Sequence, residues 1–74
     1  MAFEYGKLRG RIRERHLTES AFAGMLGVSP ATLSKKLTNK FVFTQREIVR
    51  CCELLDINDA DIKDFFFTPL VKET

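Results

Sequence analysis

The sequence has very few residues that could hold a metal ion or build a catalytic centre. Its 74 residues include one histidine, His16, and two cysteines, Cys51 and Cys52, which are adjacent. Adjacent cysteines fit neither an ordinary disulfide framework nor the ligand spacing of a zinc site. There is also no glycine-rich phosphate loop, and no nucleophile is placed with the histidine in a pattern that a small domain could orient. We therefore expect no metal site, no cofactor, no catalytic residue and no enzymatic activity.

Long apolar runs are missing as well. No stretch approaches the roughly 20 apolar residues that cross a bilayer, and the N-terminus lacks the apolar core of a signal peptide. These absences predict a cytoplasmic protein that makes no membrane contact. The stacking aromatics of an RNA-binding β-platform are also lacking, which argues against RNA as a partner. A hydrophobic share of 45% and a charged share of 30% are ordinary for one small folded domain.

Charge is distributed unevenly along the chain, although the net charge is only +2. Residues 1–40 carry eight lysines and arginines against three acids, a balance of +5, whereas residues 41–74 carry four against seven, a balance of −3. The basic half suits a polyanion such as DNA, and the acidic half would be repelled by one. An acidic pole is therefore expected to point away from DNA, and it comprises Glu53, Asp56, Asp59, Asp61 and Asp64.

The central stretch, residues 21–37, is predicted to form two short helices joined by a sharp turn. Apolar residues recur one helical turn apart on both sides of Gly27, which suits the left-handed cap of the first of these helices. Ser29 can cap the second helix, and Pro30 can occupy its first position, where the missing N–H does no harm. Ala23 supplies the small side chain that is needed where two helices cross closely. The pattern indicates helix-turn-helix geometry.

Five residues carry a resemblance to a known family, because they recur in it at these spacings: Ala23, Gly27, Val28, Ser29 and Leu33. Over residues 5–67 the sequence resembles the Cro/C1-type (XRE, phage-repressor-like) helix-turn-helix family. The segments 3–11 and 66–69 are also similar to those of short phage regulators from Gram-positive hosts. The resemblance implies an all-α, five-helix bundle of the lambda-repressor type. It also implies a DNA-binding transcriptional regulator in the lysis–lysogeny control of a phage or prophage.

The rest of the chain is predicted to complete the bundle. A first helix is expected over Tyr5–Arg15. Thr44 and Glu47 form a capping box that begins the fourth helix, on which the two cysteines lie along the apolar stripe as small hydrophobes. A fifth helix is expected over residues 59–66, with Asn58 as its cap.

The C-terminal segment is predicted to leave the bundle in extended form. Pro69 has no N–H and disfavours helix at the residue before it, so residues 67–71 cannot continue the fifth helix. This segment either folds back on the core or pairs with another chain, and the sequence does not decide between the two. We therefore divide the chain into a helix-turn-helix domain, residues 1–67, and a C-terminal tail, residues 68–74. Asn39 is expected to take the left-handed cap after the third helix.

The third helix, roughly residues 30–38, is the candidate recognition helix. In the resembled family, residues at the start of this helix and about one turn further on contact DNA. Carried over by position, these are Ser29, Pro30, Ala31, Thr32, Ser34 and Lys35. Pro30 and Ala31 depart from the family pattern, because neither can donate a side-chain hydrogen bond. Lys36 and Lys40 are expected to add positive charge, and one flank of the first helix, Arg11 and Arg15, is expected to contact phosphates.

Two functions of different classes follow from these residues. In the first, the protein binds a double-stranded DNA operator as a repressor-like transcription regulator, and it does so as a homodimer because one helix-turn-helix makes too few contacts. In the second, the same fold binds a partner repressor protein as a modulator or antirepressor. The motivation for the second is a surplus of apolar residues outside the helices, which form the candidate dimer or partner interface: Phe41, Phe43, Phe67, Leu70 and Val71. One of Phe41 and Phe43 is expected to fill the core and the other to be exposed.

Overall fold

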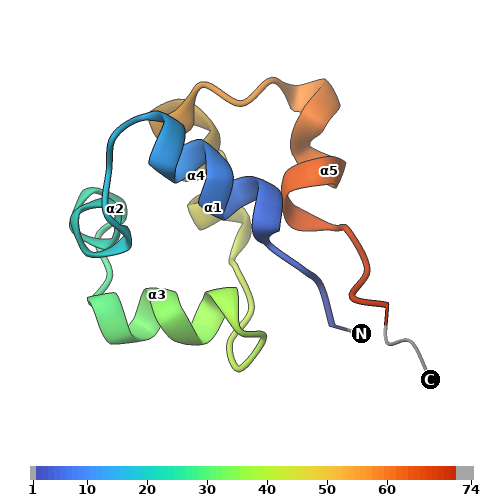
Figure 1. The fold of residues 1–74 in the computed structure, drawn as a ribbon, viewed down its shortest axis with the longest axis horizontal. Coiled ribbons are helices and arrows are strands. Elements are labelled where there is room, and N and C mark those ends of the chain that lie inside the picture. The colour runs from blue at the N-terminus through green and yellow to red at the C-terminus, as the bar shows by residue number, and fades with distance from the viewer. Residues whose placement is uncertain (1, 72–74) are drawn as a thin grey trace.

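The computed structural model describes residues 2–71, which form five α-helices around one core (Figure 1). Figure 1 shows α1 in the middle, with α2 and α3 on one side of it and α5 on the opposite side. This confirms the predicted all-α, five-helix bundle. No helix in the described part of the chain is long and apolar enough to cross a membrane. The elements in chain order are α1 (Gly6–Glu14), α2 (Glu19–Leu26), α3 (Pro30–Leu37), α4 (Gln45–Leu55), the short 3-10 helix η1 (Asp59–Asp61) and α5 (Ile62–Phe66).

Every helix contributes apolar side chains to the core. Cys51 of α4 is completely buried, whereas Cys52 is half-buried. Burial, with a smaller effect of the neighbouring Cys52, raises the pKa of the Cys51 thiol to about 12, so this group stays protonated and acts as a small hydrophobe, as predicted. The buried helical residues are Leu8, Ile12, Phe22, Ala23, Leu33, Lys36, Leu37, Cys51, Leu55, Phe65 and Phe66.

The helix-turn-helix is present and is built by the residues that predict it. Gly27 has a φ of 90°, a left-handed conformation that residues with a Cβ enter only at a cost. The N–H groups of Gly27 and Val28 both donate to the Ala23 carbonyl, at 2.9 and 3.0 Å, and so close the C-terminus of α2. Ala23 is fully buried at the crossing. Ser29 caps α3 by accepting the Thr32 N–H at 3.1 Å.

Local capping signals succeed at the fourth helix and fail at the fifth. The Thr44–Glu47 capping box is formed, with both hydrogen bonds present at 2.8 and 3.1 Å. Asn58 makes no side-chain cap, because the Asp61 N–H bonds to its main-chain carbonyl instead. The predicted fifth helix therefore begins with the 3-10 turn η1 and becomes α-helical only at Ile62.

The tail folds back on the chain's own N-terminal segment. Phe3 and Pro69 form an isolated antiparallel bridge, in which the Glu4 N–H donates to the Thr68 carbonyl at 2.9 Å and the Leu70 N–H donates to the Ala2 carbonyl at 3.0 Å. Of the two alternatives that the sequence left open for residues 67–71, the structure shows the tail folded back on its own chain, and pairing of the exposed Leu70 and Val71 with another chain stays a prediction. The last three residues of the predicted tail, 72–74, lie outside the described residues.

Asn39 fastens the N-terminal segment from the other side. Its φ of 69° confirms the predicted left-handed cap. Its side chain accepts the Phe3 N–H at 2.8 Å and donates to the Phe3 carbonyl at 2.7 Å. The turn after α3 thus holds the first residues of the chain in place. The sequence does not predict this long-range pairing, because nothing local links positions 3 and 39.

The turn at Gly27 can be tested against a glycine that has no such role. We expect Gly27→Ala to lower the free energy of unfolding by about 1–2 kcal/mol, because alanine must adopt a left-handed conformation. Gly10 lies within α1, and a Cβ there would meet nothing within 4 Å. Gly10→Ala should therefore raise the free energy of unfolding by up to about 1 kcal/mol. Urea unfolding followed by circular dichroism measures both, and equal effects of the two changes would contradict the assignment.

Candidate functional site

The outer face of α3 lies where the sequence predicts it. Ala31, Ser34 and Lys35 are exposed. Ser29 and Thr32 are occupied locally, since the Ser29 hydroxyl accepts the Thr32 N–H and donates to the Thr32 hydroxyl at 2.9 Å. Among the predicted recognition positions, Ser34 and Lys35 are exposed and carry a side-chain donor. Neither donor makes a hydrogen bond to a neighbouring residue within residues 2–71.

Lys36 does not contribute charge to this face, and that prediction is wrong. Its side chain is buried, with 6% of the residue's surface exposed. The ammonium lies 2.8 Å from Glu47 Oε1 and donates to the Val42 carbonyl at 2.9 Å. The long stem lets Lys36 pass from the edge of α3 to the first turn of α4, where Glu47 already caps the helix. A desolvated, paired lysine adds no free positive charge to the surface.

The ion pair also changes the titration of Glu47. Burial by itself raises the pKa of this carboxyl, but the hydrogen bond from Lys36, those from Thr44 and the Lys36 charge together outweigh burial. The pKa of Glu47 is therefore lower than its ordinary value of 4.5. Glu47 is consequently charged throughout the neutral range.

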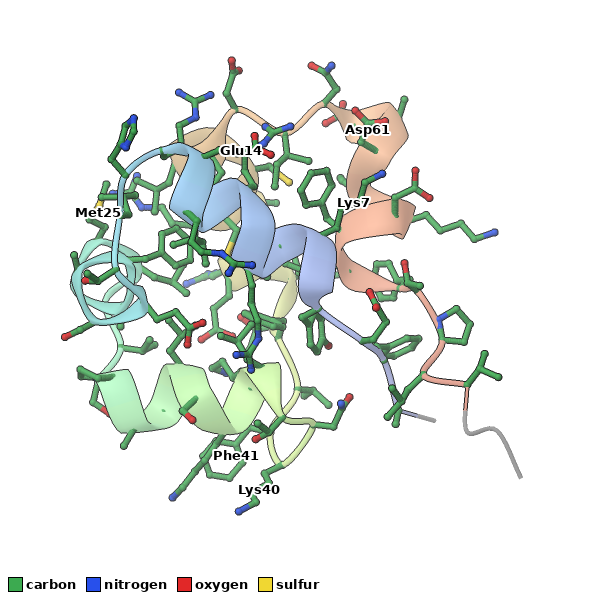
Figure 2. All side chains as sticks on the ribbon, viewed as in Figure 1. Lys7, Glu14, Met25, Lys40, Phe41 and Asp61 are labelled. Atoms are coloured by element: carbon green, nitrogen blue, oxygen red, sulfur yellow. The ribbon has the colours of Figure 1, made fainter. Side chains whose placement is uncertain are left out.

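Arg11 and Arg15 contact the C-terminal end of α4 and do not lie beside α3. Arg11 donates to the carbonyls of Leu55 and Asp56 at 2.8 and 3.1 Å, and Arg15 donates to the Leu55 carbonyl at 3.3 Å. The last turn of α4 has no basic residue of its own, so these arginines satisfy its free carbonyls and its negative dipole end. Arg11 also pairs with Glu14, which Figure 2 shows at the end of the molecule away from Lys40. The predicted phosphate-binding flank is therefore not brought next to α3.

The helix-turn-helix surface is almost uncharged. Residues 20–34, which include most of α2, the turn and half of α3, contain no charged residue. Lys36 is buried, and Lys35 and Lys40 at the end of α3 form no ion pair within residues 2–71. The sequence already contains this uncharged run. Charge balances taken over whole halves of the chain do not reveal it.

The connection between α3 and α4 divides its aromatic residues as predicted. Phe43 packs edge-on between Tyr5 and Phe66, with ring centroids 5.3 and 5.5 Å apart, so it is the phenylalanine that packs against the core. Phe41 is 47% exposed and Val42 is 79% exposed. The tail residues of the candidate dimer or partner interface, Phe67, Leu70 and Val71, are exposed as well.

A groove opens between this connection and the N-terminal segment. It has a volume of about 180 Å³, and we call it the aromatic groove. Burial raises the pKa of its Tyr5 phenol, which therefore stays neutral. Asn39 is a polar side chain of the lining, and it is already hydrogen-bonded to the Phe3 main chain. The lining comprises Phe3, Tyr5, Asn39, Phe41, Val42, Phe43, Ile48, Phe66 and Phe67.

Comparison with known proteins places the chain in a family. Residues 1–69 match the family described as "Protein of unknown function (DUF739)". The chain belongs to this family. No curated protein matches the chain. The resemblance to the Cro/C1-type family is not tested by these findings and stays a prediction.

One solved structure is similar over nearly the whole chain. It is the solution structure of the modulator of repression (MOR) of the temperate bacteriophage TP901-1 from Lactococcus lactis. The identity is 36%, the TM-score is 0.77, and the match covers 90% of each chain. A phage regulatory protein with this helical fold is thus a relative of the chain.

The buried ion pair can be tested by removing its cation. We expect Lys36→Met to lower the free energy of unfolding by about 2 kcal/mol, because the half-buried Glu47 carboxylate loses its charged hydrogen-bond donor. The matched control is Lys35→Met on the exposed side of the same turn, which should change stability by less than about 0.5 kcal/mol. Urea unfolding at pH 7 measures both variants. A loss for Lys36→Met no larger than that of the control would contradict the buried pair.

The lowered pKa of Glu47 predicts how stability depends on pH. A carboxyl whose pKa is lower in the folded state contributes stability above its ordinary value of 4.5, and this contribution is lost as the pH falls through the folded-state pKa. The free energy of unfolding of the wild type should therefore exceed that of Glu47→Gln at pH 7, and the gap should narrow below pH 4.5. Urea unfolding across this range measures the gap. The control is Glu14→Gln, which removes an exposed ion pair and should have little effect on stability. A stability difference between wild type and Glu47→Gln that stays constant into acid would refute the lowered pKa of Glu47.

Proposed function

We propose that this chain is a phage regulatory protein that modulates repression by binding a repressor protein, and that it does not read an operator on its own. The observation that carries the proposal is the nearly uncharged helix-turn-helix surface next to a set of exposed apolar side chains. The alternative stated from the sequence, a protein-binding modulator, is thus favoured over the DNA-binding reading.

The likeness to a phage modulator of repression supports the same function. That protein shares the fold over 90% of its chain and 36% of the aligned residues. Its name describes an effect on repression. A chain of the same size and fold is suited to the same kind of task.

Electrostatics supports a protein partner over DNA. Affinity for DNA comes largely from lysines and arginines that neutralise phosphates, and log K falls by about 0.9 with log salt for each phosphate neutralised. The two unpaired cations at the end of α3, Lys35 and Lys40, would by themselves contribute a slope of about −2, which is far below that of an ordinary operator-binding protein. Protein interfaces, in contrast, have a core that is depleted of charge and rich in aromatic residues. The exposed side chains of Phe41, Val42 and Phe67 give this surface the aromatic and aliphatic residues of such a core.

Operator DNA is the second candidate partner, and one observation favours it. The helix-turn-helix is correctly formed, and Ser34 and Lys35 are exposed on its second helix. These two side chains could reach base edges or phosphates in the major groove. The homodimer expected from the sequence belongs to this second function, because a modulator that binds a repressor does not need two half-site contacts.

The two functions are separated by measuring both kinds of binding. We expect size-exclusion chromatography with light scattering to show a stable complex of this chain with the repressor encoded beside its gene. Light scattering of the chain alone reports whether it is a homodimer. Fluorescence anisotropy on the intergenic DNA should show only weak binding with a shallow salt dependence.

The opposite result would contradict the proposal. Tight binding to one DNA site with a steep salt slope, lost in Lys35→Ala with Lys40→Ala, together with no complex with the repressor, would favour the DNA-binding function.

A further inference from the structure

We propose that the aromatic groove is the docking site of the partner and that it takes one apolar side chain, an aromatic ring or a leucine, from an acidic segment of the repressor. This inference rests on the proposed function and specifies the chemistry by which the partner is recognised. It follows from three properties of the groove: its size, the state of its polar lining and the charge around its mouth.

The size of the groove suits one side chain. Its volume of about 180 Å³ is close to that of a cavity of roughly 150 Å³ known to hold one benzene molecule. Its walls are also held in place, because Phe43 is packed between two rings and Phe3 is fastened by Asn39. A preformed site costs little ordering on binding, so a single apolar anchor can gain affinity there.

The lining of the groove favours an apolar occupant, because most of it consists of aromatic and aliphatic side chains. Both polar ends of the Asn39 amide already bond to the Phe3 main chain, and the Val42 carbonyl accepts from Lys36, whereas the Tyr5 hydroxyl makes no hydrogen bond with the described residues. A polar side chain entering the groove would lose its water and meet few groups to replace it. Meanwhile, the rings of Phe41 and Phe67 remain partly in solvent at the mouth of the groove. Covering them removes apolar surface from water, which favours binding.

The charge around the mouth calls for carboxylates on the partner. Lys35 lies with its ammonium 5.2 Å from the centre of the Phe41 ring. Figure 2 shows Lys40 beside Phe41 at the same end of the molecule. Neither lysine is paired with an acid in residues 2–71. The Glu4 carboxylate turns toward the first turn of α1, 3.5 Å from where a Gly6 Cβ would lie. The mouth is therefore positive and complements an acidic segment.

The chemistry of the groove can be tested without the repressor. The probe is 3-phenylpropanoate, a phenyl ring on a short chain with a carboxylate, and the control is 3-phenylpropylamine, which carries the same ring with a cation. In proton–nitrogen correlation spectra we expect the probe to shift the amide signals of Asn39, Val42 and Phe43, with a Kd on the order of 1 mM. The amine should bind several-fold more weakly.

Neutralising the mouth should remove this discrimination. In a Lys35→Gln, Lys40→Gln variant the two probes should bind equally, because the ring still fits while the charge preference is gone. Shifts that fall outside the groove, or an amine that binds as well as the carboxylate in the wild type, would overturn the inference.

Binding of the repressor tests whether the groove is the docking site. Val42→Asp places a charge at the mouth on a side chain that is 79% exposed, and Val49→Asp places the same charge on α4 at a valine that is 59% exposed and outside the groove lining. We expect Val42→Asp to weaken repressor binding at least about tenfold by isothermal titration calorimetry, and Val49→Asp to change it less than about twofold. Circular dichroism checks that both variants keep the native fold.

The outcomes separate the two levels of the proposal. If the wild type binds the repressor and Val42→Asp binds equally well, the groove is not the docking site while the proposed function stands. If the wild type does not bind the repressor, the proposed function fails, and the probe titration still decides whether the groove takes an apolar anchor with a carboxylate.

Discussion

The buried pair of Lys36 and Glu47 ties together the three segments from which the functional surface is built. Lys36 belongs to the last turn of α3, Glu47 to the first turn of α4, and the Val42 carbonyl between them accepts from the same ammonium. Removing two charges from water is costly, and the cost is offset only when hydrogen bonds satisfy both groups. Here Glu47 also accepts the Thr44 N–H, so both partners are satisfied. The pair therefore fixes the path of residues 41–43 and, with it, one wall of the aromatic groove.

The same use of cations inside the molecule determines the character of the surface. Lys36 neutralises Glu47, and Arg11 and Arg15 satisfy the carbonyl end of α4. The arginine contacts complete the hydrogen bonds of a helix end, and the lysine satisfies the Glu47 carboxylate and the Val42 carbonyl. Each of these contacts also withdraws a positive charge from any role toward DNA. Much of the excess positive charge of the N-terminal half is thus used in contacts within the bundle. The helix-turn-helix surface over residues 20–34 is left without charge.

The parts of the fold that the sequence predicts correctly are those set by neighbours along the chain. The turn at Gly27, the Ser29 cap and the Thr44–Glu47 capping box each depend on residues at most four positions apart, so local rules suffice. Asn39 also takes its left-handed conformation as predicted. The family resemblance and the helical periodicity agree with these signals, which is why the five-helix architecture could be predicted.

The site residues that were predicted wrongly are long, flexible side chains whose partners are distant in sequence. Arg11 bonds to carbonyls 44 and 45 positions away, and Lys36 reaches an acid that the sequence already assigns to a cap. Such side chains lie at the boundary of an apolar stripe, where periodicity permits either burial or exposure. The pairing of Asn39 with Phe3, across 36 positions, has the same origin. The aromatic groove depends on that pairing, and its existence could not be predicted for the same reason.

A helix-turn-helix backbone therefore does not by itself determine what the protein binds. Gly27 and Ala23 are enough to set the crossing of α2 and α3, and they place no requirement on the exposed side chains. Whether that crossing reads DNA or contacts a protein is decided by the cations that remain free once the bundle has satisfied its own helix ends. At the end of α3 the unpaired cations are Lys35 and Lys40, and both lie beside the exposed Phe41 ring. The character of this part of the surface thus depends on an aromatic ring with two cations at its edge, and not on the backbone of the helix-turn-helix.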